Sequence, residues 1–187
     1  MKIVISCHVD TVFSQPYGIL RNGIFEGAND NFASILALGR IIDDPIFMDP
    51  LIELQLTEDE EMYMDGARTI AERNNPKDTL IIVMDVTDVG ARYSFTIENV
   101  KEIRKAEIKK ALKSFGKRYK IVDEGTESEA WLYAKQGFSV LEVDIPVKGG
   151  LHSLSSTSTV ENQKAAAEAV LALLVYFKDK DISAIRS

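Results

Sequence analysis

The chain has 187 residues, of which 45% are hydrophobic and 27% are charged, with a net charge of −7 at neutral pH. This composition is typical of a globular protein, so residues 1–187 are expected to form a single domain, and the acidic balance argues against a nucleic-acid partner. The one cysteine excludes an internal disulfide, and no apolar run reaches the roughly 20 residues of a membrane span. The N-terminus lacks a signal pattern. We therefore expect a cytoplasmic protein without membrane contact.

Strand-like and helix-like stretches alternate along the chain. Short apolar or alternating runs predict strands at 2–7, 51–56, 80–84, 120–122 and 140–145. Helical periodicity predicts helices at 31–42, 64–73, 100–115, 127–136 and 160–177. This alternation predicts an α/β fold, a three-layer αβα sandwich built on a mostly parallel mixed sheet.

The stretch 100–115 has the clearest amphipathic pattern. Its apolar face comprises Val100, Ile103, Ala106, Ala111, Leu112 and Phe115. Asn99 is expected to cap this helix, with Glu102 completing a capping box, and Gly116 suits a left-handed stop. Thr159 is the expected cap of the last long helix.

Residues able to bind a metal follow the predicted strands. The set consists of His8, Glu60, Glu61, Asp85 and His152, and it includes both histidines of the chain. Because the carboxyl ends of parallel strands open into one crevice, we expect these side chains to converge. Asp30 precedes a helix instead, where the helix dipole favours a carboxylate.

The chemistry of this set fits a two-metal hydrolase. Zinc binds neutral imidazole and carboxylate, and two ions about 3.5–4 Å apart need one carboxylate to bridge them. A further carboxylate must stay unligated to take a proton from the attacking water, and the adjacent Glu60 and Glu61 can divide the roles of base and ligand. Asp10 lies two residues after His8 and would point the same way in a strand, so it is expected to orient the imidazole.

Each of these residues also has an ordinary structural explanation. A lone histidine after a strand is usually a packed or loop residue, and the run 57–61 reads as a solvated acidic loop. Asp85 suits a turn, and Asp30 suits a helix cap. Cys7 is expected to be a buried thiol facing away from His8.

Three residues within the predicted helix at 127–136 also have ordinary structural explanations. Trp131 is expected in the core rather than as a platform for a substrate. Glu127 and Glu129 are expected to be charges at the start of that helix, within reach of the mouth of the site.

Five short motifs occur in an order that resembles a known family. They are His8-Val9-Asp10, Gly27-Ala28-Asn29-Asp30-Asn31, Glu60-Glu61 followed by Gly66-Ala67, Asp85-Val86-Thr87, and His152-Ser153. This order is similar to that of the co-catalytic zinc exopeptidases, which include the bacterial leucyl-type and glutamyl-type aminopeptidases. The resemblance extends over about the whole chain.

The resemblance implies two Zn²⁺ ions, with Co²⁺ or Mn²⁺ as substitutes. Asp30 would bridge them. His8 and Asp85 would complete one site, and Glu61 and His152 would complete the other.

The resemblance also implies an activity. Glu60 would act as the general base on a metal-bridging water, and Asp10, which is expected to orient the metal ligand His8, is assigned to the catalytic set with it. The substrate would be a peptide or a small aminoacyl compound. The Asp30–Asn31 bond would be the family's cis peptide. An aspartate at position 85 favours an aminopeptidase over a carboxypeptidase.

The chain departs from the family in its length. Seven residues precede His8, 19 separate Asp10 from Asp30, and 66 separate Asp85 from His152, so no lid insertion is expected. The stretch 126–129 differs from the glutamyl-type motif and leaves specificity unassigned. A minimal core of this kind is expected to expose a sheet edge at its first strand, through which it would form oligomers.

Two alternatives to an aminopeptidase remain open on the sequence. One is a zinc-dependent deacylase or amidase that acts on a small metabolite with the same metals. The other is a non-catalytic metal-binding subunit whose missing N-terminal part comes from a partner.

Overall fold

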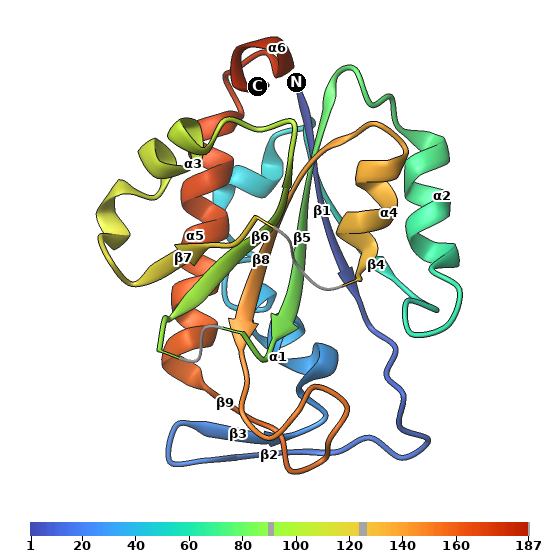
Figure 1. Cartoon of the computed structure of the whole chain (residues 1–187), viewed down its shortest axis with the longest axis vertical. Helices are drawn as coiled ribbons and strands as arrows, with labels where there is room; N and C mark the ends of the chain where they lie inside the picture. Colours follow the sequence, from blue (N-terminus) through green and yellow to red (C-terminus); the bar gives the residue numbers. More distant parts are fainter. Residues whose placement is uncertain (90–91, 124–126, 187) are drawn as a thin grey trace.

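The computed structural model describes residues 1–89, 92–123 and 127–186. Its central sheet comprises β1 (Lys2–His8), β4 (Ile52–Thr57), β5 (Thr79–Thr87), β6 (Phe95–Lys101), β7 (Tyr119–Ile121) and β8 (Ser139–Pro146). The strands lie in the order β4-β1-β5-β8-β6-β7 (Figure 1). All neighbouring strands run parallel except β6 and β8, which are antiparallel.

Helices cover both faces of this sheet. On one face lie α1 (Asn29–Leu38) and α5 (Val160–Phe177), with α3 (Lys105–Ala111) beside α5. On the other face lie α2 (Asp65–Arg73) and α4 (Glu129–Lys135). The short helical segments are η1 (Pro45–Met48), η2 (Lys113–Phe115) and α6 (Ile182–Ile185). The predicted three-layer αβα sandwich with a mostly parallel mixed sheet is therefore confirmed.

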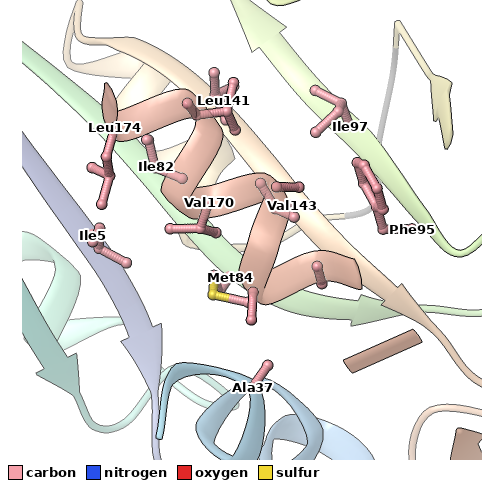
Figure 2. Close-up of a cluster of buried hydrophobic side chains, with 14 of the residues drawn as sticks. Ile5, Ala37, Ile82, Met84, Phe95, Ile97, Leu141, Val143, Val170 and Leu174 are labelled. Carbon is pink, nitrogen blue, oxygen red and sulfur yellow. The ribbon is translucent and has the colours of Figure 1, made fainter. Parts of the chain in front are cut away.

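Strand β5 is buried along its whole length, and its side chains alternate between the two layers. Ile82 and Met84 face α5 (Figure 2), whereas Ile81 and Val83 pack in the cluster formed with α2 and α4. A strand covered on both faces needs apolar side chains at every position, which is what the run at 80–84 predicts. Because β5 is packed on both faces, the position of Asp85 near its carboxyl end is fixed relative to the neighbouring strands.

A second, antiparallel sheet lies at the carboxyl ends of the main strands. It comprises β2 (Gly18–Arg21), β3 (Ile24–Gly27) and β9 (Thr157–Thr159), in the order β2-β3-β9. No strand was predicted at 18–27, although Asn22 and Gly23 carry the signal of a hairpin. Both adopt positive φ, at 52° and 75°, and Asn-Gly is the dipeptide that most favours a two-residue hairpin turn.

The prediction of one helix over 100–115 is wrong at its beginning. Strand β6 continues to Lys101, and α3 begins only at Lys105. Phe95 and Ile97 are fully buried at alternating positions, so the period of a strand prevails over the overlapping helical pattern.

The predicted capping box therefore does not form. Position 99 belongs to β6, and the side chains of Asn99 and Val100 lie outside the described part of the chain. Glu102 has a positive φ of 61°, which ends the strand, and the N-cap of α3 is Arg104. In contrast, Thr159 caps α5 as predicted, its hydroxyl accepting a hydrogen bond from the backbone of Asn162.

Two further expectations are corrected. Strand β1 lies between β4 and β5, so the first strand has no free edge, and the edges of the main sheet are β4 and β7. Trp131 is 40% exposed on α4, with the Lys135 ammonium 3.3 Å from the centre of its ring. The apolar body of Trp131 is covered by this lysine rather than by the core. No helix among the described residues is long and apolar enough to cross a membrane.

Candidate metal centre

The predicted ligands meet at the carboxyl ends of three neighbouring strands. His8 ends β1, Asp85 lies near the end of β5, and the loop after β4 carries Glu60 and Glu61. Asp30 enters from the first turn of α1. Parallel strands that end at one edge place these groups together, as the sequence predicts.

Asp30 lies between the two histidines. Its Oδ1 is 3.1 Å from Nε2 of His8, and its Oδ2 is 3.4 Å from Nε2 of His152. The Asp30–Asn31 peptide bond is cis, as the resemblance implies. One carboxylate therefore faces two imidazoles that come from opposite ends of the chain.

The two asparagines beside Asp30 hold it in place. Nδ2 of Asn29 donates a hydrogen bond to the carbonyl of Ser156 at 2.8 Å. Nδ2 of Asn31 donates to the carbonyl of Met84 at 2.9 Å. The segment is thus tied both to the loop before β9 and to β5, which carries the next acidic ligand candidate.

His8 is the most enclosed member of the site. Its Nε2 also lies 3.4 Å from Oδ1 of Asp85, which accepts a hydrogen bond from the backbone of Val86 at 2.8 Å. Burial disfavours the charged imidazole, but the carboxylates of Asp85, Asp10 and Asp30 outweigh this effect and raise the pKa of His8. An imidazole nitrogen that faces two carboxylates can hold a divalent cation in place of a proton.

Glu61 and His152 form the open half of the site. Oε2 of Glu61 lies 3.2 Å from Nε2 of His152, whose side chain is 55% exposed. Burial, and after it the charge of Asp30, raises the pKa of Glu61. Asp30 belongs both to this half and to the enclosed half, which is formed with His8 and Asp85.

Asp10 lies directly behind His8. Its Oδ1 is 3.5 Å from Nδ1 of the imidazole, and its two oxygens accept hydrogen bonds from the backbone amides of Glu60 and Glu61, each at 3.2 Å. Burial alone would raise the pKa of Asp10, but the hydrogen bonds from His8 and from these amides lower it to about 2. Asp10 is therefore ionised at neutral pH and able to orient the imidazole.

Glu60 lies beside the other groups of the site, and the pKa of its carboxyl is shifted. Burial, followed by the charge of Asp85, raises the pKa of Glu60 to about 8. One of its oxygens lies within 4.8 Å of ligand atoms of His8 and Glu61. A carboxyl of this kind can exchange a proton near neutral pH.

The arrangement of donors fits bound cations. Three sets of ligand atoms each lie within 4.8 Å of one another: His8-Asp30-Asp85, Asp30-Glu61-His152 and His8-Glu60-Glu61. Among the described residues, Oδ1 of Asp30 and Oε1 of Glu61 are buried without a hydrogen-bond partner. Buried polar atoms are normally satisfied, and a zinc-type ion would satisfy these oxygens.

A buried network beneath His8 was not foreseen. Glu129 lies in the first turn of α4, at the start of a helix as predicted, but it is 1% exposed, and Ser6 donates a hydrogen bond to its Oε2 at 2.7 Å. The hydroxyl of Tyr133 lies 2.9 Å from the same serine oxygen. Burial raises the pKa of Glu129. The signal was Ser6, a polar residue inside an apolar strand, on the same face as His8. Cys7, on the opposite face, is a buried thiol as predicted.

The centre opens into a cavity of about 390 Å³. Its apolar walls come from Met62, Met64, Val86 and Leu151, and Glu127 adds a carboxylate. Of the stretch 126–129 singled out in the sequence, position 126 lies outside the described residues.

Comparison with solved structures shows the same fold in aminopeptidases. The chain is similar to aminopeptidase PepT from Bacillus cereus, at 12% identity and a TM-score of 0.69, over 94% of this chain and 80% of that one. It is similar to aminopeptidase APDkam598 from the archaeon Desulfurococcus kamchatkensis, at 17% identity and a TM-score of 0.66, over 92% and 55%. It is also similar to the TET1 peptidase of Pyrococcus horikoshii, at 18% identity and a TM-score of 0.64, over 86% and 53%.

The chain spans about half the length of the last two proteins. A comparison with curated proteins gives no match. The profile of Peptidase family M28, however, matches residues 1–176, and this confirms the resemblance seen in the motifs. Because that match covers nearly the whole sequence, the chain belongs to Peptidase family M28.

Proposed function

We propose that the chain is the catalytic core of a two-metal aminopeptidase, which cleaves the N-terminal residue from peptides or aminoacyl compounds. The observation that carries the proposal is the position of Asp30, whose two oxygens face His8 and His152. His8 and Asp85 would hold one ion, Glu61 and His152 would hold the other, and Asp30 would contact both. The mixture of imidazole and carboxylate suits Zn²⁺, with Co²⁺ or Mn²⁺ as substitutes.

Glu60 is assigned the proton transfers. When bound, the ions would supply Lewis acidity that polarises the scissile carbonyl and lowers the pKa of the attacking water. Glu60 takes the proton from that water and returns it to the leaving amine. One oxygen of Glu60 lies within 4.8 Å of ligand atoms of His8 and Glu61, which supports a role for this carboxyl beside the proposed ions.

We assign to Asp10 the positioning of the metal ligand His8 and of the proposed base Glu60. Facing Nδ1 of His8, it favours the tautomer whose Nε2 lone pair points toward Asp30 and Asp85. Its bonds to the amides of Glu60 and Glu61 hold the base and a ligand in register.

Self-association is part of the proposal. The TET1 peptidase can assemble into a tetrahedron or a large octahedral shell. In this chain the open edge of β4 offers unpaired backbone groups for association with a second copy. Light scattering coupled to size exclusion would report the mass, and a monomer at all concentrations would contradict this part alone.

The test of the function compares Glu60→Gln with Glu58→Gln, a matched change in the same loop. A panel of aminoacyl nitroanilides and dipeptides serves as substrate, with zinc or cobalt added. Glu60→Gln is expected to lower the turnover number by about 10²–10⁴-fold with metal content unchanged, because only the proton acceptor is lost. Glu58→Gln is expected to keep the wild-type rate. Full metal-dependent activity in Glu60→Gln would refute the assignment.

A further inference from the structure

Positive charge is concentrated in one short segment of this acidic chain. Residues 101–120 contain nine of the 22 basic residues and only two of the 29 acidic ones, which gives this segment a net charge of +7. The rest of the chain carries −14. Such segregation creates a strong local potential even though the whole molecule is negative.

The fold shapes part of this segment into a cleft. The segment forms α3, η2 and β7 at one edge of the main sheet (Figure 1). A cavity of about 620 Å³ there is lined by Tyr93, Lys105, Lys109, Gly116, Lys117, Tyr119 and Ile121. Among the described residues, three ammonium groups and no carboxylate line this concave surface, in contrast to the convex solvated face that lysines of an amphipathic helix usually occupy.

Two of the three lysines form no ion pair with the described residues. Lys105 forms an ion pair with Asp123. Within residues 92–123 and the rest of the described chain, neither Lys109 nor Lys117 pairs with a carboxylate. In the part of the chain that the structure describes, the ammonium groups of Lys109 and Lys117 are therefore free of ion pairs.

The aromatic wall of the cleft is held in place. The Tyr119 ring stacks on Phe95, with 5.4 Å between the ring centres and 5° between the planes. The Arg92 guanidinium lies 5.0 Å from the centre of the Tyr93 ring. A flat ligand group would therefore meet a fixed surface and lose little free energy to its reordering.

We propose that this cleft binds a small phosphate-bearing anion, with its phosphates held by Lys109 and Lys117 and its organic part against Tyr93 and Tyr119. Lysine binds phosphate as a point charge, and a ligand with two or more negative charges matches the ammonium groups present. The site shares no lining residue with the metal centre, and strands β8 and β6 separate β7 from β5.

The charge distribution favours a small anion over a nucleic acid. Salt screens charges beyond about 8 Å at physiological ionic strength, so a ligand inside the cleft is influenced chiefly by the local lysines. An extended polyanion would reach beyond the basic segment to the remainder of the chain, whose formal net charge is −14. The concave shape also encloses a small molecule better than it fits a duplex.

Lysine footprinting tests the proposal at individual sites. The full chain is acetylated briefly with and without inorganic pyrophosphate, ADP or adenosine, and the modification of each lysine is measured by mass spectrometry. Pyrophosphate and ADP are expected to slow the modification of Lys109 and Lys117 at least threefold, with adenosine ineffective. The exposed Lys77 and Lys164, far from the segment in sequence, serve as internal controls. No protection, or equal protection of the controls, would overturn the proposal.

A pair of double variants measures the affinity. Lys109→Ala with Lys117→Ala is compared with Lys77→Ala with Lys164→Ala, which removes the same charge elsewhere on the surface. In equilibrium dialysis of chelator-treated protein, the first pair is expected to weaken ADP binding at least tenfold and the second less than twofold. Equal weakening would show a non-specific effect of net charge. Protection of the wider segment by duplex DNA at lower concentration than pyrophosphate would replace the small anion with a nucleic acid.

Discussion

Asp10 contacts His8 from the side opposite to the other carboxylates, with 3.5 Å between Oδ1 and the imidazole Nδ1. The same side chain accepts the amides of Glu60 and Glu61, so one carboxylate connects the end of β1 to the loop after β4. The orientation of a metal ligand and the position of the proposed base therefore depend on one residue.

Replacing Asp10 with asparagine should weaken metal binding. The substitution keeps the shape but removes the charge that orients His8, and loss of such an outer contact typically costs about 10–100-fold in metal affinity. Competition with a zinc chelator measures this change. Asp179→Asn, an exposed substitution near the C-terminus, is the control. Equal zinc affinity in wild type and Asp10→Asn would contradict the positioning role.

Zinc should stabilise the folded chain. An ion that binds only the folded state at 100 times its Kd adds about 2.7 kcal/mol, which corresponds to an increase of about 5–10 °C in Tm for a chain of this size. His152→Ala removes a largely exposed ligand without disturbing the core, so this variant should lose at least half of the increase. Calorimetry with and without zinc provides the comparison, and an identical increase in the variant would exclude His152 from the site.

Glu60 should make the metal-free protein less stable as the pH rises. Its folded pKa of about 8 lies above the unfolded value of about 4.3, so the folded state holds the proton more tightly. This contribution is fully present below the unfolded pKa and is lost as the pH rises toward 8. In chelator-treated Glu60→Gln the loss of stability between pH 5 and 8, measured by urea unfolding, should be smaller than in wild type.

Glu58→Gln is the matched control for this pH dependence. The slope does not vanish in Glu60→Gln, because burial also raises the pKa values of Glu61 and Asp85. A slope identical to that of wild type would show that Glu60 is not desolvated in the folded chain.

Leu141 should be essential to the sheet core. It is fully buried on β8 and faces the layer that contains α5 (Figure 2). Leu141→Ala is expected to lower the free energy of unfolding by about 2–5 kcal/mol through the cavity it leaves. Leu56→Ala on β4, where the side chain is 59% exposed, should change it by less than about 0.5 kcal/mol. Similar losses in both variants would contradict the assigned packing.

Much of the fold could be predicted because its strongest signals are local. The continuous apolar run of β5 and the alternation of strands and helices identify a parallel sheet with two covered faces. That topology then determines where strand ends meet, which explains why residues as distant as His8 and His152 were predicted together. The order of the motifs added the roles that geometry alone leaves open.

The rest could not be predicted because it depends on tertiary contacts or on competing periods. Apolar residues near position 100 satisfy both the strand and the helix period, and only pairing of β6 with β8 decides between them. Glu129 looks like a charge at the start of a helix until its contact with Ser6 is known. The basic cleft needed the fold to bring Tyr93 beside Lys117, although the clustering of positive charge is visible in the sequence.

The central claim is a two-ion centre bridged by Asp30, and elemental analysis of the chain purified without chelator tests it most directly. Wild type is expected to hold close to two zinc-type ions per chain, and His152→Ala to hold about one. A Glu58→Gln sample prepared in parallel should match wild type. Wild-type protein that binds no metal, even after zinc or cobalt is added back, would contradict the account.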